Sequence, residues 1–207
     1  MKTSQEIINF LKNNIDEKNY TSLFIAGSFP MEAKPGTDLD FFFVIKNSKK
    51  NEFFENVVSV ASQICKNNPE IDYSFFRGPL KLEYKSLLHF IVYTEKLDND
   101  SSTEKECFTN ETRVVLKSLL KSHSLIEGKP LKDLLMNVDL SNVKEQEEYL
   151  ERKKMHLRKL VDEGYIEYFE WKKIGKSWKY VLSKKFPDLK FKSYLIEYYN
   201  KSLRMEK

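Results

Sequence analysis

Two aspartates stand two residues apart at the head of a hydrophobic stretch, and their type and spacing suit metal chemistry. Asp38 and Asp40 lead into the apolar run 41–45, which favours a strand buried on both faces. Side chains alternate along a strand, so both carboxylates project from the same face. Neighbouring carboxylates repel each other, and a divalent cation such as Mg²⁺ relieves that repulsion while it also binds phosphate oxygens.

A phosphate seat is expected just before this pair. The apolar strand 22–26 ends in Gly27 and Ser28. Gly27 has no Cβ, so a bulky ligand can approach its backbone. Ser28 can cap a short helix, and the free N–H groups of a helix start suit a phosphate. A phosphate seat beside paired carboxylates provides the groups that phosphoryl or nucleotidyl transfer requires.

The stretch FIAGSFPMEAKPGTDLDFFFVI resembles the signature of the nucleotidyltransferase superfamily of DNA polymerase β. That signature is hydrophobic-Gly-Ser, a spacer of nine or more residues, and Asp-hydrophobic-Asp at the head of a hydrophobic strand. The resemblance implies that Asp38 and Asp40 bridge two Mg²⁺ ions, with Mn²⁺ as a possible substitute. It implies a third carboxylate on a later strand, and Asp72 fits as a ligand of one ion that helps to deprotonate the acceptor. Gly27 and Ser28 would hold the triphosphate.

Basic residues near the motif are candidates for contacts to phosphate or acceptor. Lys34 and Lys85 are the predicted nucleotide contacts, with Arg77 and Lys81 as further candidates. His89 lies inside the predicted strand 87–94, where the pattern favours a core histidine over a site residue.

The motif has one departure from the superfamily pattern. Many members carry Arg-Gly or a pair of small residues shortly after the Ser, and this sequence has Pro30-Met31-Glu32 there. A carboxylate at Glu32 would oppose a triphosphate unless it points to solvent. Because the Gly-Ser pair and all three carboxylates are present, we expect an active enzyme. A degenerate scaffold that binds nucleotide or RNA is the non-enzyme alternative.

The order of elements predicts an α+β fold. A capping box at Thr3–Glu6 begins a helix that ends near residue 19, and strands are predicted at 22–26, 39–45, 71–76 and 87–94, with a helix at 51–67. These elements form a small mixed-sheet nucleotidyltransferase domain, residues 1–96. A polar linker and a helical substrate-binding domain, residues 106–207, are expected to follow, with helices at 112–122, 143–161, 165–182 and 188–203.

Composition sets the remaining expectations. The chain has 207 residues, two cysteines without CxxC spacing, and no apolar run of the length that crosses a membrane. We therefore expect a cytoplasmic protein without a membrane partner. The net charge of +4 is uneven, since residues 141–207 carry 17 Lys and Arg against 11 Asp and Glu. This basic third could face an anionic partner, although the lysine-rich composition favours a solvated lysine surface.

These observations predict a Mg²⁺-dependent transferase that moves a nucleoside monophosphate from a nucleoside triphosphate to a hydroxyl, with release of pyrophosphate. The resemblance favours a small-molecule acceptor, as in the antibiotic adenylyltransferases. RNA or tRNA 3′ ends, bound by the basic third, and a protein hydroxyl, as in toxin–antitoxin systems, are the alternatives. Asparagine at position 38 or 40 is expected to abolish transfer and to leave the metal-free protein as stable or slightly more stable.

Overall fold

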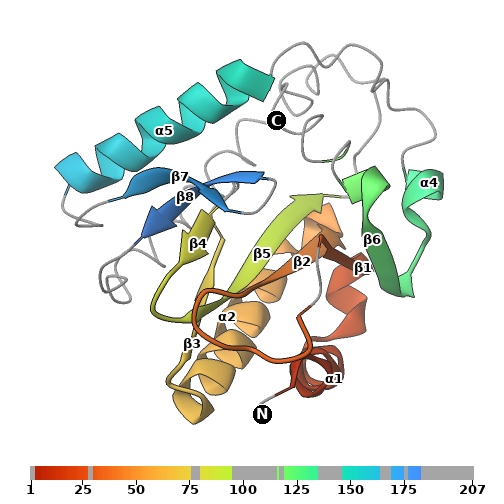
Figure 1. Cartoon of the computed structure of the whole chain (residues 1–207). Helices are drawn as coiled ribbons and strands as arrows, with labels where there is room; N and C mark the ends of the chain where they lie inside the picture. Colours follow the sequence, from red (N-terminus) through yellow and green to blue (C-terminus); the bar gives the residue numbers. More distant parts are fainter. Residues whose placement is uncertain are drawn as a thin grey trace.

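The computed structural model describes residues 3–27, 30–75, 80–94, 116, 119–134, 146–163, 169–174 and 177–182. The elements in chain order are α1 (Ser4–Asn14), η1 (Glu17–Asn19), β1 (Tyr20–Ala26), β2 (Asp38–Ile45), η2 (Asn47–Lys49), α2 (Lys50–Asn67), β3 (Ile71–Ser74), β4 (Leu80–Leu82), β5 (Ser86–Thr94), β6 (His123–Gly128), α4 (Leu131–Leu134), α5 (Gln146–Asp162), β7 (Glu170–Ile174) and β8 (Ser177–Leu182). Their arrangement is shown in Figure 1.

A five-stranded mixed sheet carries the fold, in the order β3-β5-β2-β1-β6. Strands β3, β5 and β2 run parallel to one another, while β1 is antiparallel to both β2 and β6. The α+β fold class with a mixed sheet is therefore confirmed, and it agrees with the nucleotidyltransferase-type fold that the motif predicts. The strand predicted at 87–94 lies between the two aspartate-bearing strands, a position that the sequence did not indicate.

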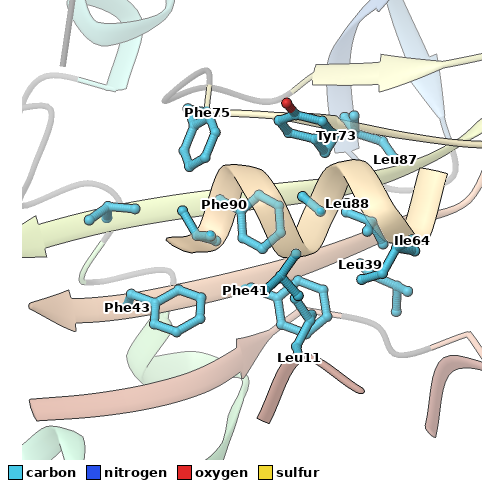
Figure 2. Close-up of a cluster of buried hydrophobic side chains, with 14 of the residues drawn as sticks. Leu11, Leu39, Phe41, Phe43, Ile64, Tyr73, Phe75, Leu87, Leu88 and Phe90 are labelled. Atoms are coloured by element: carbon cyan, nitrogen blue, oxygen red, sulfur yellow. The ribbon is translucent and has the colours of Figure 1, made fainter. Parts of the chain in front are cut away.

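Helices α1 and α2 cover one face of this sheet. The capping box is present as predicted, since Thr3 Oγ1 accepts the Glu6 N–H at 3.2 Å and Glu6 Oε2 accepts the Thr3 N–H at 3.1 Å. The α-helix ends at Asn14, five residues earlier than expected, and the 3₁₀ turn η1 follows. The core beneath these helices is rich in aromatic rings (Figure 2), and its fully buried members include Phe41, Phe43 and Phe90.

The other face of the sheet is divided along the length of β2. Phe42 and Val44, in the second half of the strand, pack with Phe24, Tyr93 and buried leucines from residues 116–131. Asp38 and Asp40 occupy the first half of the same face and are partly exposed. Burial on both faces of β2 therefore begins at Phe41, directly after Asp40, as the apolar run 41–45 predicts.

The segment after residue 165 differs from its prediction. A helix was expected at 165–182, but β7 and β8 form an antiparallel hairpin there. The physical reason is visible in EWKKI-GK-SWKYVL, where aromatic and β-branched residues flank a two-residue connection that contains glycine. The spacing of the apolar residues fits a helix as well as a strand, and sheet pairing decides between them. Helix α5, by contrast, confirms most of the helix predicted at 143–161 and ends one residue beyond it.

Strand β8 pairs in parallel with β4, which makes a second, three-stranded sheet in the order β4-β8-β7. Figure 1 shows α5 alongside this small sheet, and Leu157 and Leu160 of α5 join the main hydrophobic core. Residues on both sides of the predicted linker therefore share sheets, because β6 also pairs with β1. The linker and the helices predicted at 112–122 (except 116 and 119–122) and 188–203 lie outside the described residues, so the domain boundary stays a prediction.

No helix among the described residues has the length and apolar character to cross a membrane.

Two glycines with positive φ allow a matched test of this fold. A Cβ at Gly128 (φ +94°) would lie 2.1 Å from the Thr21 carbonyl oxygen, whereas a Cβ at Gly36 (φ +79°) would meet nothing within 4 Å. Both Gly→Ala changes carry backbone strain, of order 1–3 kcal/mol, and only Gly128→Ala adds a clash with β1. We expect Gly128→Ala to lower the free energy of unfolding more than Gly36→Ala does in urea denaturation. Equal losses would contradict the β1–β6 pairing.

Candidate active site

The paired aspartates of β2 lie at the amino end of the parallel strands. In the register of the sheet, Asp38 stands beside Leu87 of β5 and Asp40 stands beside His89. Neighbours in register share a face, so Asp38, Asp40 and His89 project from the same side of the sheet. This is the side opposite to α1 and α2. The prediction that both carboxylates share one face is confirmed.

Asp40 is held between β5 and the end of β1. Its Oδ1 lies 3.0 Å from Nδ1 of His89, which is 4% exposed. A Cβ built on Gly27, at the end of β1, would lie 3.4 Å from Oδ2 of Asp40. The two carboxylate oxygens therefore face different surroundings, one a buried imidazole and the other the backbone of Gly27.

The other two carboxylates contact lysines. Lys81 Nζ, from β4, lies 3.4 Å from Oδ1 of Asp38, and Lys85 Nζ, from the β4–β5 connection, lies 3.8 Å from Oδ2 of Asp72. The side chains of Asp38 and Asp72 are only 11% and 10% exposed. Partly buried carboxylates are costly without compensation, and these two cations supply it.

Asp72 lies on the same face of the sheet, on β3, and β5 separates it from the strand that carries Asp38 and Asp40. It stands beside Leu87 of β5, and Leu87 stands in turn beside Asp38. Two strand spacings of roughly 4.8 Å place the Asp72 and Asp38 backbones about 10 Å apart. The three predicted carboxylates therefore lie on one face of the sheet, and the buried Leu87 separates Asp72 from Asp38.

Gly27 contributes space and not a hydrogen-bond donor. Its φ of +73° suits a residue without a Cβ, and its N–H donates to the Ser122 carbonyl at 3.1 Å. A phosphate at this turn would therefore take its N–H donors from other residues. Ser28, the other half of the predicted seat, lies outside the described residues, as does Arg77.

Hydrogen bonds hold the loop before Asp38 at residues 31–32 and again at Thr37. The Ser4 N–H donates to the Met31 carbonyl at 3.1 Å, and Thr3 forms an isolated β-bridge with Glu32. Nearer the site, Thr37 Oγ1 lies 2.9 Å from Ser86 Oγ. Glu32 and Lys34 are exposed in this loop. The departure from the superfamily pattern thus leaves the Glu32 carboxylate at the surface, beside the start of α1.

The donor set of this site fits Mg²⁺. Carboxylate oxygens are the ligands that this hard cation prefers, and proteins commonly bind it through one or two carboxylates together with substrate phosphates. Among the described residues no three His, Cys, Asp or Glu side chains converge as a metal-binding group. The protein therefore offers an open pair of carboxylates and not a closed cage.

The sequence did not single out two residues of this site, His89 and Lys81. His89 was favoured as a core histidine, and it is buried as expected, but it also contacts Asp40. Lys81 was one of several equivalent cations. The useful signal is a spacing of four, because positions 81, 85 and 89 each contact one of the three carboxylates. That spacing gains meaning only once β5 is known to lie between β2 and β3.

Comparison of the sequence with protein families and with curated proteins finds no match. Among solved structures, the chain is similar to spectinomycin adenyltransferase AAD(9) from Enterococcus faecialis, solved with ATP and spectinomycin. The identity is 14%, the TM-score is 0.43, and the match covers 76% of this chain and 67% of that one. A toxin-antitoxin structure solved with AMP-PNP is similar at 11% identity and a TM-score of 0.29, over 77% of this chain and 96% of that one. Both TM-scores are below 0.5, so these likenesses do not identify what the site does.

Proposed function

We propose that this chain is a Mg²⁺-dependent nucleotidyltransferase that moves a nucleoside monophosphate from a nucleoside triphosphate to a hydroxyl, releasing pyrophosphate. The observation that carries the proposal is the placement of Asp38 and Asp40 on one face of β2, with Oδ2 of Asp40 facing Gly27. We propose a small-molecule acceptor, because a catalytic domain followed by the expected C-terminal helical domain resembles the small-molecule nucleotidyltransferases.

In the proposed reaction the acceptor oxygen attacks the α-phosphorus, and the bond from that phosphorus to the β-phosphate oxygen breaks. The acceptor proton goes to a base, and pyrophosphate leaves with the bonding electrons. When bound, two Mg²⁺ ions, for which Mn²⁺ can substitute, supply positive charge at the attacking and leaving oxygens. Asp38 and Asp40 would hold both ions, and Asp72 would hold one of them and receive or relay the proton.

Lys81 and Lys85 have one role before the cations and nucleotide bind and another role afterwards. Without nucleotide, Lys81 and Lys85 neutralise Asp38 and Asp72. When cations take their place at the carboxylates, the flexible ammonium groups are free to contact the triphosphate, because a lysine is a mobile point charge on a four-carbon stem. Lys34, exposed four residues before Asp38, is a further candidate for a phosphate contact, and Ser28 for the phosphate seat.

Incubation with each α-³²P-labelled nucleoside triphosphate, Mg²⁺ or Mn²⁺, and a cell extract would test the proposal. Products are separated into RNA, protein and small-molecule fractions. We expect label in the small-molecule fraction. Label in RNA or protein would keep the chemistry and replace the acceptor, whereas nucleotide binding without transfer to any fraction would contradict the enzyme and favour a scaffold.

The carboxylate pair gives the first mutational prediction. Asp38→Asn and Asp40→Asn should each lower transfer by at least about 100-fold, because the charge that holds the cations is lost. Since Lys81 and His89 already compensate these carboxylates, we expect the metal-free stability to fall by about 1 kcal/mol. This expectation reverses the one drawn from the sequence. Glu32→Gln, a carboxylate change in the exposed loop, is the matched control and should retain activity. Near-wild-type transfer by either aspartate variant would contradict the metal site.

Asp72 and Lys85 form a second pair whose roles can be separated. If Asp72 acts on the acceptor, Asp72→Asn should lower kcat by at least about 100-fold with little change in the KM for the nucleotide. Lys85→Met removes the cation and should instead raise the KM for the nucleotide. Steady-state kinetics with varied triphosphate measures both values. Equal and small effects of the two variants would mean that the pair only stabilises the fold.

A further inference from the structure

A buried polar side chain that the reaction has not used lies directly beside Asp40. His89 sits within β5 among strands on both sides, and its side chain is 5% exposed. A buried imidazole needs a hydrogen-bond partner. Its Nδ1 lies 3.0 Å from Oδ1 of Asp40, and the parallel register places the two residues directly side by side.

The direction of this hydrogen bond follows from the chemistry of the two groups. An ionised carboxylate can only accept, so Nδ1 of His89 must carry a proton and donate it. Both the neutral Nδ1–H tautomer and the imidazolium satisfy this requirement. The contact therefore orients Asp40 whichever of these two forms the ring adopts.

The contact also decides which oxygen of Asp40 remains for a ligand. Oδ1 is engaged by His89, and Oδ2 faces the backbone of Gly27, where an added Cβ would lie 3.4 Å away. The bond between the carboxyl carbon and Cβ rotates readily in a free aspartate. The donor on β5 fixes that rotation, so that Oδ2 is presented toward the end of β1, where the triphosphate seat is proposed.

We propose that His89 is a positioning residue that fixes the carboxylate of Asp40 and so prepares it to hold a divalent cation. This inference rests on the proposed function, because it assumes that Asp40 binds the cation. Hydrogen-bond partners behind metal ligands are worth 10–100-fold in metal affinity or activity. A purely structural role for His89 would affect the stability of the sheet without a comparable effect on the cation.

Three substitutions separate positioning from packing. His89→Asn keeps an N–H donor at the place of Nδ1, because Nδ2 of asparagine is attached to Cγ in the same way. His89→Gln keeps a polar group of similar volume but moves its donor further along the side chain. His89→Leu removes the donor and retains most of the volume. If the leucine variant does not fold, the asparagine and glutamine variants still carry the comparison.

The measurement is the affinity of the full chain for Mn²⁺, without nucleotide, from the electron paramagnetic resonance signal of the free ion. We expect His89→Leu and His89→Gln to weaken Mn²⁺ binding about 10–100-fold, and His89→Asn to remain within about threefold of wild type. The kcat for transfer should follow the same order, while thermal unfolding should not. Equal Mn²⁺ affinity in all four proteins, or equal weakening in all three variants, would overturn the positioning role.

Asp40→Asn distinguishes this failure from failure of the proposed function. If wild type binds Mn²⁺, Asp40→Asn does not, and His89→Leu binds normally, only the role of His89 is wrong. If wild type and Asp40→Asn bind Mn²⁺ equally, or neither binds it, the cation site itself is wrong and the role of His89 with it. In the double variant, His89→Leu should cause no further loss, since the two residues act through one contact.

Discussion

Two like charges on one face of a largely buried strand are the constraint around which this structure is arranged. Asp38 and Asp40 cannot both be ionised at the edge of a hydrophobic core without compensation. The chain supplies it from one short stretch, residues 81–89, whose Lys81 and His89 contact the pair. The same stretch compensates Asp72 through Lys85. The segment that runs from β4 into β5 therefore provides both the central strand of the parallel part of the sheet and the side chains that contact the three carboxylates.

The hydrophobic half of β2 explains why the carboxylates stay where they are. Residues 41–45 are fully buried, with core on both faces. A slip of one residue in the register would exchange the two faces of the strand. It would drive Asp38 and Asp40 into the layer beneath α1 and α2 and expel phenylalanines from it, at a cost of several kcal/mol. The core thus determines the side on which the site forms, and the loops determine its details.

The sequence was sufficient for features that depend on local pattern. The capping box of α1, the buried half of β2, the shared face of Asp38 and Asp40 and the α+β class all follow from spacing and residue type. It failed where the pairing of strands decides the outcome. The apolar residues of the β7–β8 hairpin fit both periods, so the sequence predicts a helix where the strands pair. The contact between His89 and Asp40 depends on β5 entering the sheet beside β2, and no periodicity within 87–94 specifies a neighbour.

The lysines of the cluster also bear on how an anionic substrate could approach three carboxylates. A triphosphate is repelled by uncompensated negative charge, and the repulsion is strong at a partly buried site. Lys81 and Lys85 already reduce that charge in the metal-free chain, at 3.4 Å and 3.8 Å from their partners. If cations replace them at the carboxylates, the ammonium groups are not lost from the site, since their stems remain anchored beside β5. On the proposed function, cation binding therefore does more than fill a site, because divalent cations added to three carboxylates and two ammonium groups make the cluster positively charged as the nucleotide arrives.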